Sequence, residues 1–492
     1  MSVKNKFFGV LEKTAKKIPM VSHKMDKEYD KMLGEIEKSA KPYKNMESYP
    51  SIPETGISHE DILSVMTDFQ QKEEGKWKDG FVSGAVYNGD QKHIDFLNKV
   101  YALNSQSNPL HSDIWPSISK YEAEIVSMTA NMMHGKEVSG TDEVCGVVSS
   151  GGTESIMLAM KTYRDWAREK KGIKKPEMIV PVTAHAAFDK ASQYFGIKMV
   201  HVDVDSEYKA KVDEVKKAVN KNTIVIVGSA PTFPHGIIDP IQEMSEIALK
   251  NEIGFHTDAC LGGFVLPWAE KLAYNVPLFD FRLPGVTSMS ADTHKYGYAA
   301  KGTSVVLYRN LELRHYQFYT ATDWPGGLYF SPTFAGSRPG SLSASCWASL
   351  LSVGEKGYMD STKKILQAAD KIKKGIGEMP ELNILGNPLW VISFASKELD
   401  IYQIMDAMTR KQWSLNGLHK PSAIHIALTL RHTQEGVAER FIEDLKQSVA
   451  EIKANPKTEG GMAPIYGLAA KIPFRGAISD LLKRYLDILY KI

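Results

Sequence analysis

The stretch that decides the fold is Ser290-Ala-Asp-Thr-His-Lys-Tyr-Gly297, which runs on to Lys301-Gly-Thr-Ser304. Small residues precede it, and an apolar, β-branched run follows it, so we interpret it as strand, loop, strand, with Lys295 on the loop. A lysine held this way can form a Schiff base with an aldehyde once it loses a proton. Burial or a cationic neighbour promotes that loss, and His294 or Lys301 is the neighbour we expect.

A second stretch lies upstream, Phe255-His-Thr-Asp-Ala-Cys-Leu-Gly-Gly-Phe264. A short apolar run here leads to Asp258 at the start of a glycine-rich turn. Read alone, the aspartate caps a turn. A carboxylate at this place can also keep a pyridinium nitrogen protonated, which is what pyridoxal phosphate needs to draw electrons from a substrate carbon.

A third stretch, Val147-Val-Ser-Ser-Gly-Gly-Thr-Glu-Ser-Ile-Met157, is typical of a strand, a small-residue turn and a helix. Gly151 and Gly152 let backbone N–H groups approach a phosphate, and the helix N-terminus adds partial positive charge. The spacing matches neither the dinucleotide-binding nor the Walker pattern. A turn of this kind is weak evidence alone, but followed by Asp258 and Lys295 in this order it predicts a phosphate-bearing cofactor.

The pattern between Cys145 and about Arg309 alternates between apolar runs and amphipathic helices. This predicts a mainly parallel, seven-stranded sheet with helices on both faces, of the α/β class. The expected strands are Cys145–Val148, Met178–Val182, Met199–Val204, Thr223–Ser229, Gly254–Thr257, Val286–Met289 and Ser304–Tyr308. Ligands of such sheets bind at the carboxyl ends of strands, where the three stretches converge.

A chain of 492 residues exceeds one hydrophobic core, so we expect several parts. We divide it into a basic N-terminal arm and linker at 1–57, a segment at 58–115 that contributes to the active site and dimer, a large cofactor-binding domain at 116–345, and a small C-terminal α+β domain at 346–492. A helix at 343–354 leads into the last of these, where we expect helices at 365–376 and 436–452 and strands near 383–385, 389–393 and 423–428.

The composition and charge of the chain argue against several classes of protein. The net charge of +2 gives no argument for nucleic acid binding. Three scattered cysteines without metal spacing indicate a reducing compartment. We find no secretory signal and no apolar run long enough to span a bilayer. The lysine-rich arm, Lys4 to Lys44, is either an amphipathic helix on an anionic membrane or a solvated arm.

The motifs resemble those of fold-type-I pyridoxal phosphate enzymes, with the aspartate aminotransferase-like fold. Among these, they most closely resemble the sphingosine-1-phosphate lyase family, which is itself similar to group II decarboxylases. The matching segments are Ser83–Tyr87, Asn108–His111, Ser149–Ser155, Ala184–Phe188, Phe233–Gly236, Asp258–Phe264, Ser290–Tyr298 and Ala335–Gly340. Eukaryotic members carry a membrane anchor ahead of a similar basic segment. The resemblance therefore implies a cytoplasmic-facing protein, held at the endoplasmic reticulum if an anchor has been removed.

The resemblance also implies roles for individual residues. Lys295 is the Schiff-base lysine, Asp258 the partner of the ring nitrogen, and His185 stacks on the ring. The cofactor is pyridoxal 5'-phosphate, and its phosphate is held by a set that includes Ser337 of a partner subunit: Gly151, Gly152, Thr153, His294 and Ser337. An obligate homodimer with shared active sites follows. The substrate phosphate is assigned to Tyr87, Asn108, His111 and Lys301.

The implied reaction is a retro-aldol cleavage of a phosphorylated sphingoid base into a long-chain aldehyde and phosphoethanolamine. The base for the 3-hydroxyl stays open between Lys295, a tyrosine and a phosphate oxygen. Two alternatives remain at this point. One is a pyridoxal phosphate amino acid decarboxylase related to glutamate decarboxylase. The other is a degenerate, non-enzymatic homologue, against which the intact Lys295, Asp258 and His185 argue.

Overall fold

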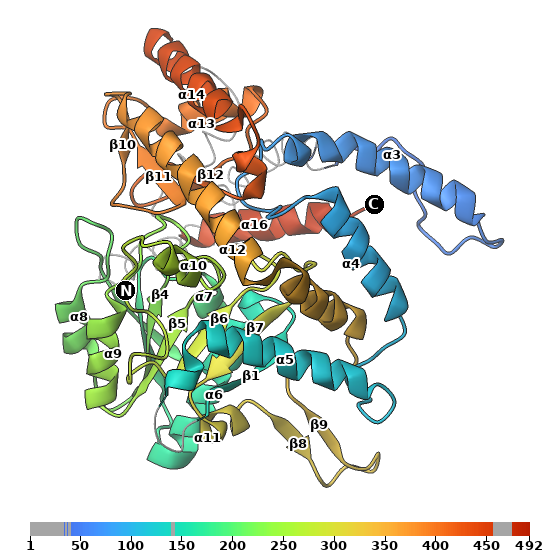
Figure 1. The fold of residues 1–492 in the computed structure, drawn as a ribbon, viewed down its shortest axis with the longest axis vertical. Coiled ribbons are helices and arrows are strands. Elements are labelled where there is room, and N and C mark those ends of the chain that lie inside the picture. The colour runs from blue at the N-terminus through green and yellow to red at the C-terminus, as the bar shows by residue number, and fades with distance from the viewer. Residues whose placement is uncertain (1–33, 35–36, 38–40, 139–142, 456–474) are drawn as a thin grey trace, which may run out of the picture. The chain divides into compact units, whose positions relative to one another are not determined.

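The structure is a computed structural model that describes residues 34, 37, 41–138, 143–455 and 475–492 (Figure 1). Most of the basic arm predicted from Lys4 onward lies outside the described residues. The chain divides into two compact units. The larger comprises residues 76–418 and 423–458, and the smaller comprises residues 1–75, 419–422 and 459–492.

The larger unit contains a seven-stranded sheet in the order β1-β7-β6-β5-β4-β2-β3. Only β7 runs antiparallel to its neighbours, β1 and β6, and the other adjacent pairs are parallel. The prediction of a mainly parallel, seven-stranded sheet is therefore confirmed. The strands are β1 (Cys145–Ser149), β2 (Glu177–Pro181), β3 (Lys198–Val202), β4 (Thr223–Ser229), β5 (Gly254–Asp258), β6 (Ser288–Ala291) and β7 (Ser304–Tyr308).

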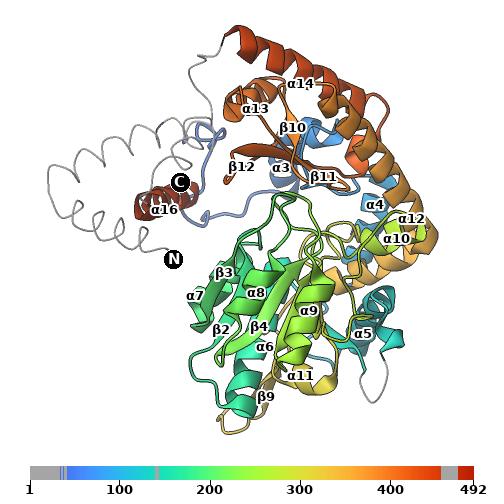
Figure 2. The same cartoon turned by 90° about the vertical axis from the view of Figure 1, so that its left-hand side faces the viewer.

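Helices cover both faces of this sheet (Figure 2). On one face, Tyr163 of α6 packs on Gly254, and the Phe188 ring of α7 lies 6.0 Å from the His256 ring. On the other, Ile241 of α9 packs against Gly228. The helices between residues 91 and 315 are α4 (Gln91–Leu103), α5 (Pro116–Met132), η1 (Gly135–Glu137), α6 (Gly152–Lys171), α7 (Ala187–Phe195), α8 (Val212–Ala218), α9 (Ile241–Lys250), α10 (Leu266–Lys271) and α11 (Leu311–His315).

The C-terminal part of this unit contains a four-stranded antiparallel sheet in the order β10-β11-β13-β12. The helices expected at 343–354 and 365–376 are two halves of α12, which bends where Gly354 has φ 60° and ψ 173°. A short hairpin, β8–β9, precedes α12. The elements are β8 (Tyr319–Ala321), β9 (Tyr329–Ser331), α12 (Gly340–Gly377), β10 (Asn383–Ile384), β11 (Val391–Ala395), α13 (Ile401–Arg410), β12 (Asn416–Leu418), β13 (Ala423–Ala427), η2 (Leu430–Thr433) and α14 (Val437–Ala454).

The described residues of the smaller unit include most of α3 (His59–Lys78) and all of α16 (Arg475–Tyr490). Ser58 caps α3, because its hydroxyl accepts a hydrogen bond from the Asp61 amide at 3.1 Å. Across the described ranges, no helix has both the length and the apolar character needed to cross a membrane.

Candidate active site

A cavity of about 330 Å³ opens at the carboxyl ends of the parallel strands. Parallel strands end at the same edge of a sheet, so β1, β2, β5 and β6 all deliver loops there. Every residue predicted to bind the cofactor lines this cavity, except Ser337. The lining residues are Ser150, Gly151, Gly152, Thr153, Glu154, Ile156, His185, Asp258, Cys260, Asp292, His294 and Lys295.

The turn between β1 and α6 presents the helix N-terminus to the cavity, with Gly151 as the N-cap. A Cβ atom at Gly152 would lie 2.7 Å from both carboxylate oxygens of Asp292 and 2.8 Å from the Cys260 sulfur. Only glycine fits this position, and the backbone amides of the turn stay accessible. The start of a 20-residue helix therefore offers N–H donors and partial positive charge to an anion.

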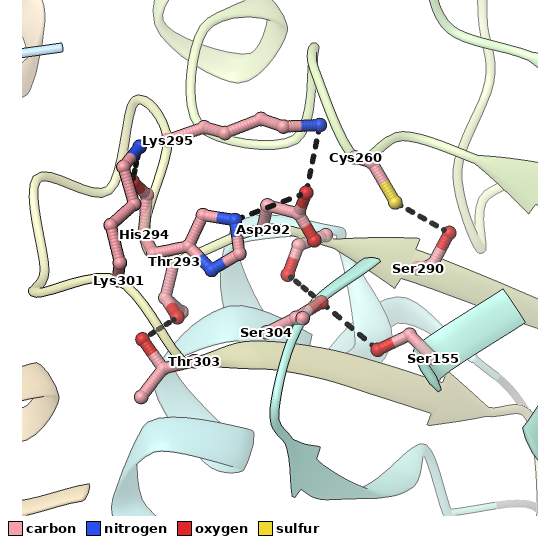
Figure 3. Close-up of polar contacts among 12 residues, drawn as sticks. Ser155, Cys260, Ser290, Asp292, Thr293, His294, Lys295, Lys301, Thr303 and Ser304 are labelled. Carbon is pink, nitrogen blue, oxygen red and sulfur yellow. Dashed lines mark hydrogen bonds and ion pairs between the residues drawn. The ribbon is translucent and has the colours of Figure 1, made fainter. Parts of the chain in front are cut away.

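Lys295 extends from the β6–β7 loop into the cavity, where its Nζ lies 2.8 Å from Oδ2 of Asp292 (Figure 3). The Nε2 atom of His294 lies 3.7 Å from the same oxygen. Burial disfavours the charge on Lys295, but Asp292, Cys260 and Tyr87 outweigh burial, so the pKa of Lys295 is raised. The expectation that a cationic neighbour promotes loss of the proton is wrong here, because the nearest charged group is an anion.

Asp292 is the site residue that the sequence prediction missed. Its side chain is almost fully buried, and although burial opposes ionisation, Lys295 and His294 outweigh it and lower the pKa of Asp292. The available signal was its position: it is a carboxylate directly after a buried strand and three residues before the lysine. Cys260, which also lines the cavity, was not singled out either.

Asp258 and His185 reach the cavity from β5 and from the loop after β2. Oδ1 of Asp258 accepts hydrogen bonds from the Cys260 amide at 3.1 Å and from the Ser290 hydroxyl at 3.3 Å. Nδ1 of His185 accepts one from the Ala187 amide at 3.1 Å, which fixes the half-buried imidazole. A carboxylate and an aromatic ring thus line the same cavity as Lys295.

Tyr87 and Lys301 come together beside Lys295. The Lys301 ammonium lies 4.4 Å from the Tyr87 ring centroid and 3.3 Å from the His294 carbonyl oxygen. The Tyr87 ring packs edge-on against Tyr296 at 4.8 Å. Loss of hydration and repulsion by Lys295 lower the pKa of Lys301 to about 8. Two of the four residues predicted to bind the substrate phosphate are therefore neighbours.

Asn108, His111 and Ser337 form a separate group, none of which lines the cavity of its own chain. Asn108 Nδ2 donates to the Ser337 hydroxyl at 3.0 Å, and the His111 amide donates to the Asn108 carbonyl at 3.0 Å. Arg338, beside Ser337, pairs with Glu122 through Nη2 at 2.6 Å and so holds this group in place.

The cavity suits pyridoxal phosphate. Its volume lies at the small end of ligand pockets. Within the part of the chain that the structure describes, Nδ1 of His294 and Oδ1 of Asp292 are buried without a hydrogen-bond partner. The glycine turn and His294 offer donors to a phosphate, Lys295 offers an amine to an aldehyde, and Asp258 offers a carboxylate to a ring nitrogen. Unused polar atoms of this kind indicate a ligand that completes the site.

Comparisons with known proteins agree with this chemistry. The pyridoxal-dependent decarboxylase conserved domain matches residues 85–395. The chain is 46% identical to the sphingosine-1-phosphate lyase of Arabidopsis thaliana over 487 residues, which cover 98% of this chain and 88% of that protein. The solved sphingosine-1-phosphate lyase of Burkholderia pseudomallei superposes with a TM-score of 0.86 at 40% identity, covering 92% of this chain and 99% of that one.

The glutamate decarboxylase of Lactobacillus brevis is also similar in structure. Its TM-score is 0.71 at 20% identity, over 85% of this chain and 97% of that one. Identity at this level shows a shared fold and carries no argument about the substrate.

Proposed function

Because the chain belongs to the sphingosine-1-phosphate lyase family, we propose that the cavity around Lys295 is the active site of a carbon–carbon lyase. It uses pyridoxal phosphate to cleave sphingosine 1-phosphate, or a related phosphorylated sphingoid base, into a long-chain aldehyde and phosphoethanolamine in sphingolipid degradation. The observation that carries the proposal is that Lys295, Asp258 and His185 line one cavity together with the N-terminus of α6.

The residues that would hold the cofactor follow from the lining of the cavity. The Gly151–Thr153 turn and His294 would bind its phosphate, Asp258 its ring nitrogen and Lys295 its aldehyde carbon, with His185 against the ring. When bound, pyridoxal phosphate supplies an electron sink for the pair released as the C2–C3 bond of the substrate breaks. The protein selects that bond by orienting the substrate.

Lys301 and Tyr87 orient the substrate by binding its phosphate. A phosphate with nearly two negative charges needs its own partners when it leaves water. The ammonium of Lys301, on the same loop as Lys295, provides one of them, and the Tyr87 ring against it fixes its direction. Asp292 holds the ammonium of Lys295 at 2.8 Å, so Lys295 Nζ carries a proton that it can deliver to C2 after cleavage.

The active enzyme is a homodimer in which Asn108, His111 and Ser337 act in the partner's cavity. This is supported by their absence from the lining of their own cavity and by the exposed apolar residues of the β8–β9 hairpin. Trp324 is 55% exposed, Leu328 77% and Phe330 65%, which is unusual for three large apolar side chains in one short hairpin. Burial against a second copy would remove this surface from water.

The products separate this proposal from a decarboxylase of the same fold. The protein loaded with pyridoxal phosphate is incubated with sphingosine 1-phosphate and, separately, with glutamate. We expect hexadecenal and phosphoethanolamine in equal amounts from the first and no carbon dioxide from the second. Carbon dioxide from glutamate without aldehyde from the lipid would overturn the proposal.

A further inference from the structure

A continuous chain of hydrogen bonds leads from the interior of the sheet to Asp258. The Tyr163 hydroxyl lies 2.6 Å from the Ser288 hydroxyl, which lies 2.7 Å from Nδ1 of His256. Nε2 of His256 lies 3.2 Å from the Ser290 hydroxyl, which donates to Oδ1 of Asp258 at 3.3 Å. The chain thus runs from α6 to the residue assigned to the cofactor's ring nitrogen.

The register of β5 and β6 builds this chain. His256 pairs with Ser288 and Asp258 with Ser290, so all four side chains point to the same face, towards α6. Gly254, two residues before His256, leaves room for the Tyr163 ring, which a side chain there would strike. Gly254, His256 and Asp258, at alternate positions of β5, therefore all contribute to this hydrogen-bond chain, the glycine by leaving room for Tyr163.

The direction of the donors follows from chemistry. An ionised Asp258 only accepts, so Ser290 uses its single hydrogen on that carboxylate and must accept from His256. His256 then carries its hydrogen on Nε2 and accepts at Nδ1 from Ser288. The Ser288 oxygen is left to accept from the Tyr163 hydroxyl, which also lies 3.2 Å from the Phe255 carbonyl oxygen. Each group donates once, and the chain ends on the carboxylate. Hydrogen bonds aligned in this way strengthen one another in a buried setting.

The chain is sealed from water. The side chains of Tyr163, His256, Ser288 and Ser290 are each fully buried. Burial lowers the pKa of His256 to about 4, although Asp258 opposes that shift, so the imidazole is neutral at physiological pH and keeps a lone pair for Ser288. A surface histidine would exchange its partners with water, whereas this one has a fixed tautomer.

We propose that His256 is a positioning residue for Asp258. Through Ser290 it holds Oδ1 of the carboxylate as an acceptor, so that Oδ2 is free to face the ring nitrogen of the cofactor. The inference rests on the role proposed above for Asp258. On this proposal, the polar side chains of β5 and β6 position the carboxylate that faces the cofactor's ring nitrogen, and they do not serve only to pack the sheet.

A double-mutant cycle with His256→Leu and Asp258→Asn tests this, using pyridoxal phosphate labelled with nitrogen-15 in its ring. The readouts are the nitrogen-15 chemical shift of the bound ring and the cofactor Kd of the apoprotein from fluorescence quenching. We expect His256→Leu to raise the Kd about fivefold, the effect of one buried hydrogen bond between the neutral imidazole and the Ser290 hydroxyl. It should also move the shift towards that of Asp258→Asn, and it should change neither quantity when Asp258 is already Asn.

Two further variants sharpen the result. His256→Gln keeps a donor at the position of Nε2 and should restore part of the affinity. Ser288→Ala removes only the hydroxyl that donates to Nδ1 and should raise the Kd about threefold, which provides the measurement if His256→Leu does not fold. The matched control is His201→Leu, an exposed histidine on β3 of the same sheet, which should change neither readout.

The outcomes separate cleanly. An unchanged nitrogen-15 shift in folded His256→Leu or in Ser288→Ala would overturn the positioning role, as would an equal loss of affinity with and without Asp258. An unchanged shift in Asp258→Asn alone would instead remove Asp258 from the ring nitrogen, and the proposed site assignment would fail independently of His256.

Discussion

The chemistry of Lys295 depends on a single neighbouring carboxylate. The ammonium and Asp292 lie 2.8 Å apart in a cavity from which much of the water is excluded, so each stabilises the charge of the other. Lys301 occupies the opposite situation, because Lys295 repels it and it has no carboxylate at a similar distance among the described residues. Two lysines on one loop therefore differ in pKa and, we propose, in task.

Substitution of Lys301 by Ala tests that division. A charge-assisted hydrogen bond to a phosphate contributes roughly 1.5–3 kcal/mol, so kcat/KM for sphingosine 1-phosphate should fall about ten- to a hundredfold. The visible absorption band of the bound cofactor should not change, because Lys301 does not line the cofactor cavity. Loss of cofactor in the variant would place Lys301 at the wrong phosphate. Lys190→Ala, at a solvent-exposed lysine of α7, is the control.

The pH dependence of kcat/KM follows from the same residue. The pKa of Lys301 is lowered to about 8, so its charge is present below that pH and is lost as pH rises through it. Because kcat/KM reports groups of the free enzyme, we expect it to decline above about pH 8 in the wild-type enzyme. Lys301→Ala should flatten this limb of the profile, and an identical decline in both proteins would assign it to another group.

Among the helices and strands, the start of α6 has the strictest requirement, which is for a residue without a side chain at Gly152. A Cβ at Gly152 would press on Asp292 and Cys260, so Gly152→Ala must displace either the turn or the Asp292 carboxylate. We expect the cofactor Kd of the apoprotein to rise at least about tenfold, from the loss of one or more donors to the phosphate. Gly377→Ala, in a helix with open space around the site, is the matched control and should bind cofactor normally. Normal binding by Gly152→Ala would refute the phosphate assignment.

Sequence patterns predicted the elements that have a strong period or an apolar run. All seven strands of the large sheet were predicted, because each is a short buried run between turn residues. The β8–β9 hairpin was not, since its strands are only three residues long and mostly exposed, and they show no alternation. α10 was missed as well, being six residues long with a proline near its start. The two helices predicted before and after Gly354 are confirmed, because the non-helical backbone of that glycine separates the two parts of α12.

The sequence predicted the residues that line the cavity more completely than the charge interactions among them. Gly151, Gly152, Asp258 and Lys295 follow strand ends that the pattern located, so their convergence was expected. The pairing of Lys295 with Asp292 was not, because the direction of two side chains on an irregular loop has no signature in the sequence. The hydrogen bonds of His256 depend on the register between β5 and β6, which the sequence does not reveal either.

At the level of the whole molecule, the proposed dimer predicts complementation between inactive chains. Lys295→Ala is coexpressed with a His111→Ala, Ser337→Ala double variant under different tags, and the mixed dimer is isolated. If His111 and Ser337 act in the partner's cavity, one of its two sites is intact, and we expect about half of the wild-type activity. Arg338 is left unchanged, because its pair with Glu122 supports its own chain.

The result is unambiguous because residues that act within their own chain give the opposite outcome. Both sites of the mixed dimer would then carry a lesion. An inactive mixed dimer, with each subunit folded, would therefore contradict shared active sites.

Buried histidines predict the response of the apoprotein to acid. Burial, the largest cause in each case, lowers the pKa of His235, His256, His425 and His432 to about 4. Unfolded histidines titrate near 6.5, so below that pH the unfolded state binds protons that the folded state does not, and stability falls as pH drops towards 4.

Asp239 acts with the opposite sign, because burial raises its pKa to about 7. The four histidines outnumber this aspartate, so the unfolded state binds more protons than the folded state within this window. The Tm of the apoprotein should therefore be clearly lower at pH 5 than at pH 7.5. An equal or higher Tm at pH 5 would mean that these imidazoles are not held neutral.

The most direct measurement of the whole account is the identity of the lysine that binds the cofactor. The protein loaded with pyridoxal phosphate is reduced with borohydride, digested and mapped by mass spectrometry, with Lys295→Ala treated in parallel. The account predicts a phosphopyridoxyl group on the peptide that contains Lys295 and no stoichiometric label in the variant. A label on Lys301 or on any lysine outside the cavity would contradict it.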